Sequence, residues 1–574
     1  MKPLLRMAFG LLGLVLGYVL VSDEPFAFAD KPDKAKKGST AATTRDPAPV
    51  AAEIDKIINA KLTEEKIPAS PLCDDAEFIR RTSLDIRGRV PSMDRTVAFL
   101  NDKDPNKRVK LIDEFLADSE YGEHFAIIWY HRIVKPDDDN RLLIAGNKLQ
   151  DWLEDSFNQN HGWNKIAYEL LTASGDRDDN PPVTFFLANV NDNKNHYEPA
   201  PNKLTTASSR LFFGVKLECC ECHNHPYNTM KQTDYWGVAA FFGNTHAEHS
   251  SKKDAKAGVT ATVHEGKPSM PGGAGKKAKD EKITASHAAF GSIEIPDSKG
   301  KTVRAKFLNA ETPSFNAGQP LRPVLAKWLT SEQNPFFSRA QVNKLWANFF
   351  GRGIINPVDD MSDEDKATHP EVLKLLADEF VASGFDLKHL IRCICLSETY
   401  QRSSQALPSN KDDDKLYSHI KPKILSADML FDSLAVVLGR PIGGDDQAKG
   451  KKGQGNKKKY GGGSRAAFRK FFHAEADDDV GVVEDYTQGI PQALKLLNAP
   501  GINNTNEVVA RIRKSADNQD KVIEGIYLTV LSRLPKETET KKLKEYAAKE
   551  SNANKAFNDM MWALLNSAEF MFNH

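Results

Sequence analysis

The chain has 574 residues, of which 27% are charged and 40% are hydrophobic. This ordinary globular composition excludes a fully disordered chain and a collagen-like fold. The 78 basic residues balance the 78 acidic residues, so we expect no chain-wide attraction to nucleic acid or to an anionic membrane. Six cysteines are too few for a fold of this length that is held together by disulfides.

Residues 1–29 have the order of charged, apolar and small residues that is typical of a secretory signal peptide. Lys2 and Arg6 flank the start of an apolar run from Met7 to Val21, and the small-residue pattern Ala27-Phe28-Ala29 follows. Cleavage there would release the mature chain into the periplasm or outside the cell. A retained anchor is the alternative, although the run is about 15 residues and a membrane span needs about 20. We expect no membrane span after signal removal, because no later stretch is long and apolar enough.

Apolar residues at helical spacing predict helices in both halves of the chain. A second helical block begins near Leu321, Gly384 fits the end of one helix, and Asp386 fits the N-cap of the next. The predicted stripes and segments are Ile54, Ile57, Ile58 and Leu62; Val109, Ile112, Phe115 and Leu116; residues 121–134; Val372, Leu375, Leu376 and Phe380; Leu387, Leu390, Ile391 and Ile394; and, in a last helix, Met561, Leu564, Leu565 and Phe570.

Other segments interrupt the helical pattern. Residues 30–49 have the composition of a disordered leader. Residues 249–282 are rich in Gly, Lys and Ala, which is typical of a flexible insertion. Gly291–Ile295 and Thr302–Phe307 alternate like short strands. The low-complexity residues 443–465 favour a solvated loop, with a polyanion-binding arm as the alternative.

We therefore predict a mainly α protein with multi-helical N- and C-terminal domains and a small β-containing middle segment. The domains that we expect after the signal peptide and the leader are an N-terminal helical domain over 50–248, the insertion 249–282, the strand-bearing segment 283–320, and a C-terminal helical domain over 321–574 that contains the loop 443–465.

One short segment of the N-terminal domain carries a specific chemical pattern. Cys219-Cys-Glu-Cys-His223 contains C-x-x-C-H, the spacing at which c-type haem is attached. The thiols of Cys219 and Cys222 can each add to one haem vinyl group, and the imidazole of His223 can then bind the iron. Chance gives only ~0.002 such patterns in a chain of this composition. Export favours the same interpretation, since c-type haem is attached outside the cytoplasm.

Other interpretations of this segment stay open. They are a redox or structural disulfide between Cys219 and Cys222, a zinc or other metal site that also uses His223 and His225, and a metal-free turn. Cys220 adds a third thiol, which could compete for a vinyl group or pair with another cysteine. The candidates for a further iron ligand are Met230, His225, His246 and His249.

Weaker features lie elsewhere in the chain. Asp137-Asp138-Asp139 and Asp359-Asp360 could bind a cation such as calcium, but a solvated loop is the favoured interpretation of both. Cys393 and Cys395 lie on one predicted helix and point to different faces, which predicts buried thiols rather than a disulfide. The sequence contains no G-x-S-x-G, P-loop or H-E-x-x-H motif, which weakens the case for familiar hydrolases and NTPases.

Longer stretches match the sequence pattern of a known family. In the N-terminal half these stretches are Ile54-Asp55, Phe78–Pro91, Ser119–His124, His196–Pro199, Cys219–Pro226 and Asp234–Phe242. In the C-terminal half they are Asn334–Trp346, Phe349–Gly353, His369–Glu371, Ser397–Tyr400, Gln492–Asn498 and Leu564–Phe570. With them the chain resembles the large planctomycete proteins that join two domains of unknown function, a cytochrome-c-like one numbered fifteen forty-nine and a second numbered fifteen fifty-three.

The resemblance implies a secreted or periplasmic protein with a cytochrome-c-type motif. By this resemblance Cys219 and Cys222 are the haem thiol positions and His223 is the iron ligand, while His225 and Pro226 match the motif without an established role. The family usually has other residues between the motif cysteines, and the cysteine at position 220 departs from that pattern. The family has no assigned reaction, so the resemblance implies a cofactor but no substrate.

We therefore expect an exported protein that binds haem c for electron transfer or redox chemistry with a redox partner that the sequence does not identify. The apolar residues Leu211, Phe212 and Val215, which precede the motif, would help to exclude water from the haem. One alternative is a non-haem extracellular binding or scaffold protein with a structural metal or disulfide at the motif. A second is a secreted polymer hydrolase. Whether the protein is an enzyme stays open, and no nucleic-acid partner is expected.

Overall fold

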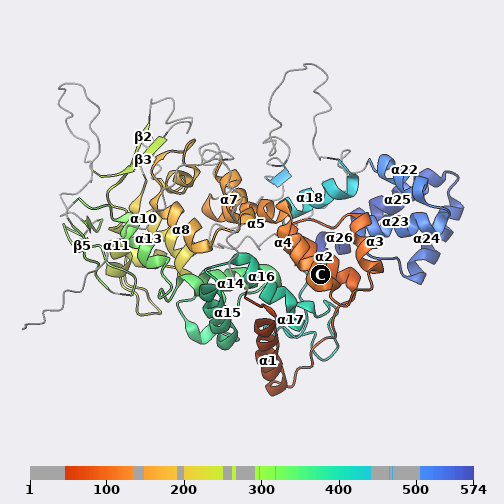
Figure 1. The fold of residues 1–574 in the computed structure, drawn as a ribbon, viewed down its shortest axis with the longest axis horizontal. Coiled ribbons are helices and arrows are strands. Elements are labelled where there is room, and N and C mark those ends of the chain that lie inside the picture. The colour runs from red at the N-terminus through yellow and green to blue at the C-terminus, as the bar shows by residue number, and fades with distance from the viewer. Residues whose placement is uncertain are drawn as a thin grey trace, which may run out of the picture. The chain divides into compact units, whose positions relative to one another are not determined.

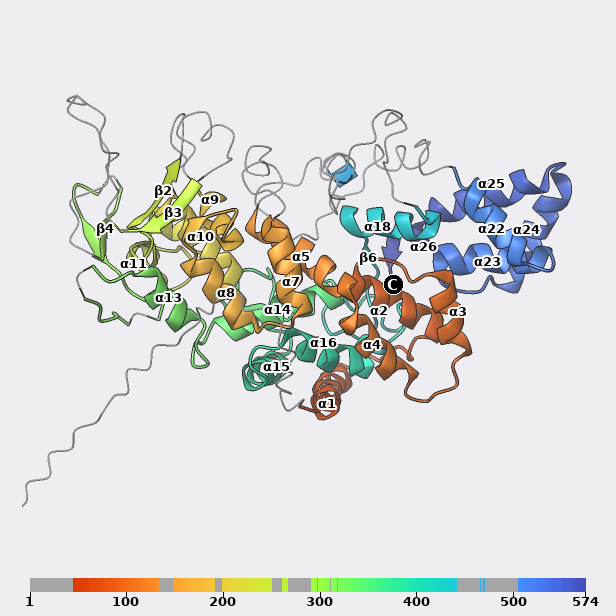
Figure 2. The same cartoon turned by 45° about the horizontal axis from the view of Figure 1, so that its top comes forward.

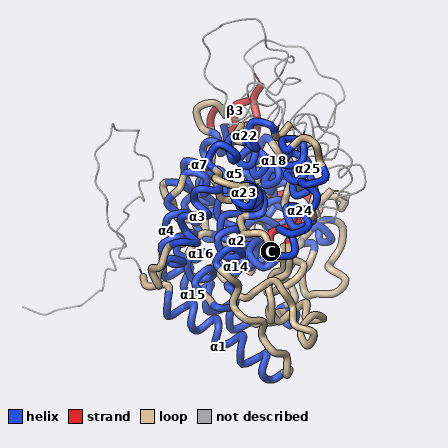
Figure 3. Tube along the Cα trace, turned by 90° about the vertical axis from the view of Figure 1, so that its right-hand side faces the viewer, coloured by secondary structure: helices blue, strands red, loops and turns tan. Residues whose placement is uncertain are grey.

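The computed structural model describes residues 45–134, 148–190, 199–249, 261–266, 291–296, 298–309, 311–316, 318–440, 465, 468–469 and 504–574. All of them belong to one unit, Arg45–His574. Helices dominate these ranges (Figure 1), and strands are few and short (Figure 3), which confirms the mainly α fold class. The predicted signal peptide and the predicted loop 443–465, apart from Arg465, lie outside the described residues. No described helix combines the length and the apolar run that a bilayer crossing requires.

The N-terminal half consists of short helices that bury one or more faces. In α1 the buried residues include Ile54, Ile58 and Leu62 of the stripe that the sequence predicts, and Ile57 is partly buried. The helices are α1 (Ala48–Glu64), α2 (Asp75–Arg87), α3 (Met93–Asn101), α4 (Lys107–Ala117), α5 (Ser119–Ile133), α7 (Lys148–Asn158), α8 (Trp163–Thr172), α9 (Thr184–Leu187), α10 (Pro201–Ser208) and α11 (Gln232–Ala239). Single turns are η1 (Pro181–Val183), the π-helical η2 (Ser209–Phe213) and η3 (Glu218–Glu221).

The C-terminal half also consists of helices that bury one or more faces. Asp386 caps α16 by accepting the backbone N–H of His389 at 2.9 Å, and Gly384 follows α15 with a φ of +73°, as predicted. The elements are α13 (Arg322–Leu329), α14 (Phe337–Phe350), η4 (Glu364–Lys366), α15 (Pro370–Ala382), α16 (Leu387–Leu396), α17 (Glu398–Gln401), α18 (Ala427–Leu438), α22 (Asn506–Ser515), α23 (Gln519–Leu531), α24 (Glu537–Lys549), α25 (Ala553–Leu565) and α26 (Ala568–Met571).

The prediction of one last helix is wrong in detail. Helix α25 ends at Leu565, and Ser567 starts the separate helix α26 because its side chain accepts the backbone N–H of Phe570. A serine at this position competes for backbone hydrogen bonds and so favours a cap over a helix interior.

The described strands form three small antiparallel sheets. One has the order β1 (Gly175–Asp176), β3 (Ala261–Glu265), β2 (Thr245–His249). A second pairs β4 (Ser292–Glu294) with β5 (Thr302–Arg304), and a third pairs β6 (Lys423–Ile424) with β7 (Phe572–Asn573). The second sheet confirms the strands expected in the middle segment, although both strands end earlier than predicted.

Strand β3 corrects the prediction that residues 249–282 are a flexible insertion. Within this range Val263 is buried, and Glu265 forms a buried ion pair with Arg322 of α13 at 3.1 Å. Arg322 also donates to the backbone oxygen of Ala173 at 2.8 Å. The surrounding Gly, Lys and Ala residues dominate the composition of the range and hide this short alternating segment.

The hydrophobic core crosses from the N-terminal to the C-terminal half. The larger cluster of buried side chains extends from Ile54 to Ile420. A smaller cluster joins Leu84 and Val90 to α18, α22, α23 and α25. Accordingly α3 lies beside α23 (Figures 1 and 2). The domain boundaries drawn from the sequence stay predictions.

Two arginines of α2 bind backbone oxygens of the C-terminal half. The fully buried Arg80 donates to the oxygens of Val530 at 3.2 Å and Phe570 at 2.9 Å, and burial lowers its pKa to about 10. Arg81 donates to the oxygen of Tyr400 at 2.6 Å. Buried guanidinium groups need several acceptors, so α2 fixes these distant segments in place.

Candidate functional site

The C-x-x-C-H segment follows a change of chain direction at Gly214. The π-helical turn η2 ends there, and Gly214 has a φ of +65°, a left-handed conformation that favours glycine. A Cβ atom at this position would lie 2.9 Å from the Cβ of Ala340 on α14, so the close packing also requires glycine. The chain then forms the 3₁₀ turn η3, which contains the first two cysteines of the motif.

The three cysteines of the segment differ in their exposure. Cys219 and Cys222 are exposed free thiols, and His223 next to them is exposed as well. Cys220 is 0% exposed and lies in the larger core cluster, and burial raises its pKa to about 11. A thiol that is buried and protonated is a poor nucleophile, so the structure separates two accessible thiols from one inert thiol.

The ring of His223 makes one contact that bears on its tautomer. Its Nδ1 lies 2.8 Å from the backbone oxygen of Asn224. A carbonyl oxygen only accepts hydrogen bonds, so in the neutral ring Nδ1 carries the proton and Nε2 keeps its lone pair. Metal-binding histidines commonly donate their second ring N–H to a carbonyl in this way. His223 is therefore arranged to bind a metal through Nε2.

His225 has the opposite arrangement. Its Nδ1 accepts the backbone N–H groups of Tyr227 and Asn228, both at 3.2 Å, so in the neutral ring the proton lies on Nε2. Its own backbone N–H donates to the oxygen of Met230 at 2.9 Å. His225 thus organises the turn after the motif, and neither ring nitrogen offers a free lone pair in this conformation.

The other expected ligands lie in different surroundings. Met230 is partly buried and packs against the larger core cluster. His246 lies on β2 opposite His264 of β3, with ring centres 5.9 Å apart. His249 ends β2, and its side chain is outside the described residues. Within the described ranges, no three or more His, Cys, Asp or Glu side chains are grouped to hold a metal ion.

The apolar residues before the motif belong to the core. Leu211, Phe212 and Val215 are all buried, and the ring of Phe212 lies 6.2 Å from those of Trp163 and Phe185. They support the segment from the core, and their role in shielding a haem stays a prediction.

Glu221, between the two exposed cysteines, anchors the segment. Its carboxylate accepts from the side-chain amide of Asn202 at 3.0 Å and from the hydroxyl of Tyr235 at 3.3 Å. Its backbone oxygen accepts the indole N–H of Trp236 at 2.9 Å. The sequence does not single out these partners, because only the fold brings α10 and α11 to the motif.

Thiol labelling tests this arrangement directly. In protein made without haem, we expect two of the six free cysteines, Cys219 and Cys222, to react rapidly with an aromatic disulfide reagent. Glu221→Ala releases the segment, so Cys220 should then react as well, whereas Glu221→Gln keeps one acceptor oxygen and much of the protection. Counting labelled thiols and mapping the peptides measures this. Rapid labelling of Cys220 in the parent protein would contradict the structure.

The structure also places the two cysteines of α16 and one of the two acidic clusters. Cys393 and Cys395 are buried free thiols, as predicted, and burial raises the pKa of Cys393 to about 12. Asp137–Asp139 lie outside the described residues. The expectation of a solvated loop is wrong for Asp359, which is 4% exposed; the loop after α14 folds back over the helix.

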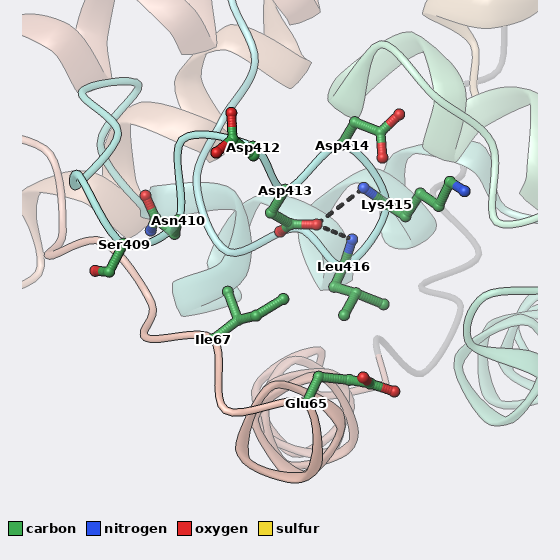
Figure 4. Close-up of a pocket in the computed structure, with 9 residues that line it drawn as sticks. All are labelled: Glu65, Ile67, Ser409, Asn410, Asp412, Asp413, Asp414, Lys415 and Leu416. Atoms are coloured by element: carbon green, nitrogen blue, oxygen red, sulfur yellow. Dashed lines mark hydrogen bonds between the residues drawn. The ribbon is translucent and has the colours of Figure 1, made fainter.

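An open acidic pocket of about 420 Å³ lies elsewhere on the structure. It is lined by Glu65, Ile67, Ser409, Asn410, Asp412, Asp413, Asp414, Lys415 and Leu416 (Figure 4). Burial alone would raise the pKa of Asp413, but hydrogen bonds from Ser418 and Leu416 outweigh it and hold the pKa below its ordinary value. The carboxylates of Asp412 and Asp414 point in other directions (Figure 4), so the pocket does not gather them around one ligand.

Comparison with known proteins finds two family models that match parts of the chain. A family model described as a protein of unknown function (DUF1549) matches residues 53–247, and a second described as a protein of unknown function (DUF1553) matches residues 321–547. The two matches follow each other in this order along the chain. The DUF1549 match contains the exposed motif, and the DUF1553 match contains α13 to α18, α22, α23 and most of α24. The chain matches no curated protein and no solved structure.

Proposed function

We propose that the chain is an exported cytochrome-like protein in which haem c is attached through Cys219 and Cys222 and the iron is bound by His223. The observation that carries the proposal is the 2.8 Å contact between Nδ1 of His223 and the backbone oxygen of Asn224, which in the neutral ring leaves the lone pair of Nε2 for a metal. When bound, haem c supplies a one-electron redox couple.

The residues of the segment fit this group. Both motif thiols are exposed and unpaired, so each is accessible to a vinyl group. The extra thiol of Cys220 is buried, so it does not compete for attachment. This supports clean attachment in spite of the departure from the usual family pattern.

Electron transfer is the proposed activity, with a redox partner still to be identified. The motif lies at the surface, and Tyr227 beside it is 92% exposed, so a partner protein can approach the segment. Aromatic side chains that are exposed in this way are typical anchors of protein interfaces. Met230, His246 and His249 remain the proposed further iron ligands, while the ring of His225 is already engaged in the turn.

Export forms part of the proposal. It is supported by the charged, apolar and small-residue order of residues 1–29 and by the requirement that c-type haem is attached outside the cytoplasm. The protein would then act in the periplasm or after secretion. A planctomycete source is the corresponding expectation from the resemblance.

A pyridine haemochrome spectrum tests the proposal. The mature protein is produced in a host with cytochrome c maturation machinery, beside a Cys219→Ala, Cys222→Ala double variant. We expect the c-type spectrum in the parent and none in the variant. A folded but colourless parent would overturn the proposal, and zinc in stoichiometric amount in that sample would favour the structural metal site instead.

A further inference from the structure

A strip of polar side chains lies on the face of α14 that is directed towards the DUF1549 domain. Gln341, Lys344 and Asn348 are three and four residues apart and therefore share one helix face. Arg132 of α5 donates to the side-chain oxygen of Asn348 at 2.9 Å. The strip thus lies between the two matched regions of the chain.

Several polar atoms near this strip are buried without a protein partner. Lys344 and Asp359 are each 4% exposed, and Gln341 is also buried. Among the described residues, the Nζ of Lys344, both carboxylate oxygens of Asp359 and the Oε1 of Gln341 have no hydrogen-bond partner. Native proteins satisfy almost all such atoms with protein groups or ordered water, so this concentration of atoms without a protein partner calls for a non-protein partner, either water or another ligand.

The position of Asp359 is fixed from both sides. On one side, the side chain of Asn343 donates to the backbone oxygen of Val358 at 3.2 Å. On the other, the backbone N–H of Met361 donates to the oxygen of Gly214 at 2.7 Å. Asp359 is therefore held in place between these anchors and does not lie on a free loop.

Lys344 and Asp359 influence each other without forming an ion pair. Burial lowers the pKa of Lys344 to about 7, and the positive charge of Arg132 contributes to this shift. The negative charge of Asp359 raises the same pKa, but by less. The lysine and the aspartate are thus close enough to interact electrostatically, yet neither group makes a hydrogen bond to the other. Two buried charges in this arrangement are costly unless a polar group between them binds both.

We propose that Gln341, Lys344 and Asp359 form a buried binding site for a hydroxyl-bearing ligand. The hydroxyl oxygen accepts a hydrogen bond from Lys344, and its hydrogen is donated to Asp359. Only a group that both accepts and donates suits this pair, because Asp359 disfavours an anion and the two neighbouring cations disfavour a metal ion. The hydroxyl group belongs either to water or to a small alcohol or sugar.

A crystal structure of the mature protein, at a resolution that shows ordered water, tests the site. We expect a non-protein oxygen within about 2.7–3.2 Å of both the Nζ of Lys344 and a carboxylate oxygen of Asp359. A direct ion pair between these side chains, or no density between them, would overturn the proposal.

The pH dependence of stability gives an independent test in solution. The pKa of Lys344 is lowered from 10.5 to about 7 in the folded protein, so between these values the unfolded chain binds one more proton. Stability should therefore rise with pH across this window. Lys344→Met should remove this rise, whereas the exposed control Lys374→Met should keep it. An unchanged slope in Lys344→Met would contradict the burial of the Lys344 amine in this site.

A titration with glycerol and glucose separates the two sources of the hydroxyl group. A saturable rise in the unfolding temperature of the parent that is lost in Asp359→Asn identifies a small alcohol or sugar as the ligand. An equal, non-saturating response in both proteins, together with the bridging oxygen in the crystal, identifies water. Both outcomes support the hydroxyl site.

Discussion

Cys222→Ala, exported in a host that attaches c-type haem, should lose at least half of its covalent haem, while Cys220→Ala should carry as much as the parent. The two thiols lie in the same segment but differ in exposure, since Cys222 is exposed and Cys220 is buried. Attachment needs a thiol that can approach the vinyl group, and burial raises the pKa of Cys220 to about 11. Only the exposed thiol should therefore be required.

Haem content per protein, measured after denaturation, checks this prediction. Cys220→Ala is the matched control, because it removes one thiol from the same segment. Loss of haem in Cys220→Ala, or full retention in Cys222→Ala, would contradict the assignment of the attachment thiols.

Asp85→Ala should strongly destabilise the folded protein. The carboxylate of Asp85 on α2 is buried and accepts from the hydroxyl of Tyr400 at 2.9 Å, the ammonium of Lys423 at 2.6 Å and the amide of Asn573 at 2.7 Å. These partners lie on α17, β6 and β7, so one side chain of the DUF1549 domain joins three later segments of the chain.

Removal of this carboxylate leaves the largely buried ammonium group of Lys423 without its counter-ion. Breaking a buried ion pair from one side costs about 3–5 kcal/mol, and we expect the free energy of unfolding to fall by this amount. Urea unfolding of the mature protein measures it. The exposed pair of Glu53 and Lys56 supplies the control, because Glu53→Gln should cost less than about 1 kcal/mol. Equal effects of the two substitutions would contradict the role of Asp85.

Local patterns predict the helices well, because each one depends on residues that are close in sequence. The stripe of Ile54, Ile58 and Leu62 and the N-cap at Asp386 are examples of this. Strand β3 could not be predicted in the same way. Its stability depends on the buried pair of Glu265 and Arg322, two residues that only the fold brings together.

The same distinction holds for the candidate site. The spacing of the motif identifies Cys219, Cys222 and His223, since attachment chemistry depends on that spacing. It does not reveal that Cys220 points into the core or that the ring of His225 is engaged by backbone N–H groups. Those properties follow from tertiary packing and from the conformation of the turn.

The buried polar site between α5 and α14 has no sequence signal of its own. A lysine such as Lys344 within an apolar helix is usually exposed at its charged end. The pair Asp359-Asp360 likewise favours a solvated loop by composition alone. The burial of Lys344 and Asp359 follows from the contacts of the loop with α14 and with Gly214.

The mass of the peptide that contains Cys219–His223, isolated from the exported protein, tests the haem assignment most directly. We predict one haem bound covalently to this peptide, through both exposed thiols, with the thiol of Cys220 free. An unmodified peptide, or one in which Cys219 and Cys222 are joined by a disulfide, from folded protein made with active maturation machinery would contradict the proposed cytochrome function.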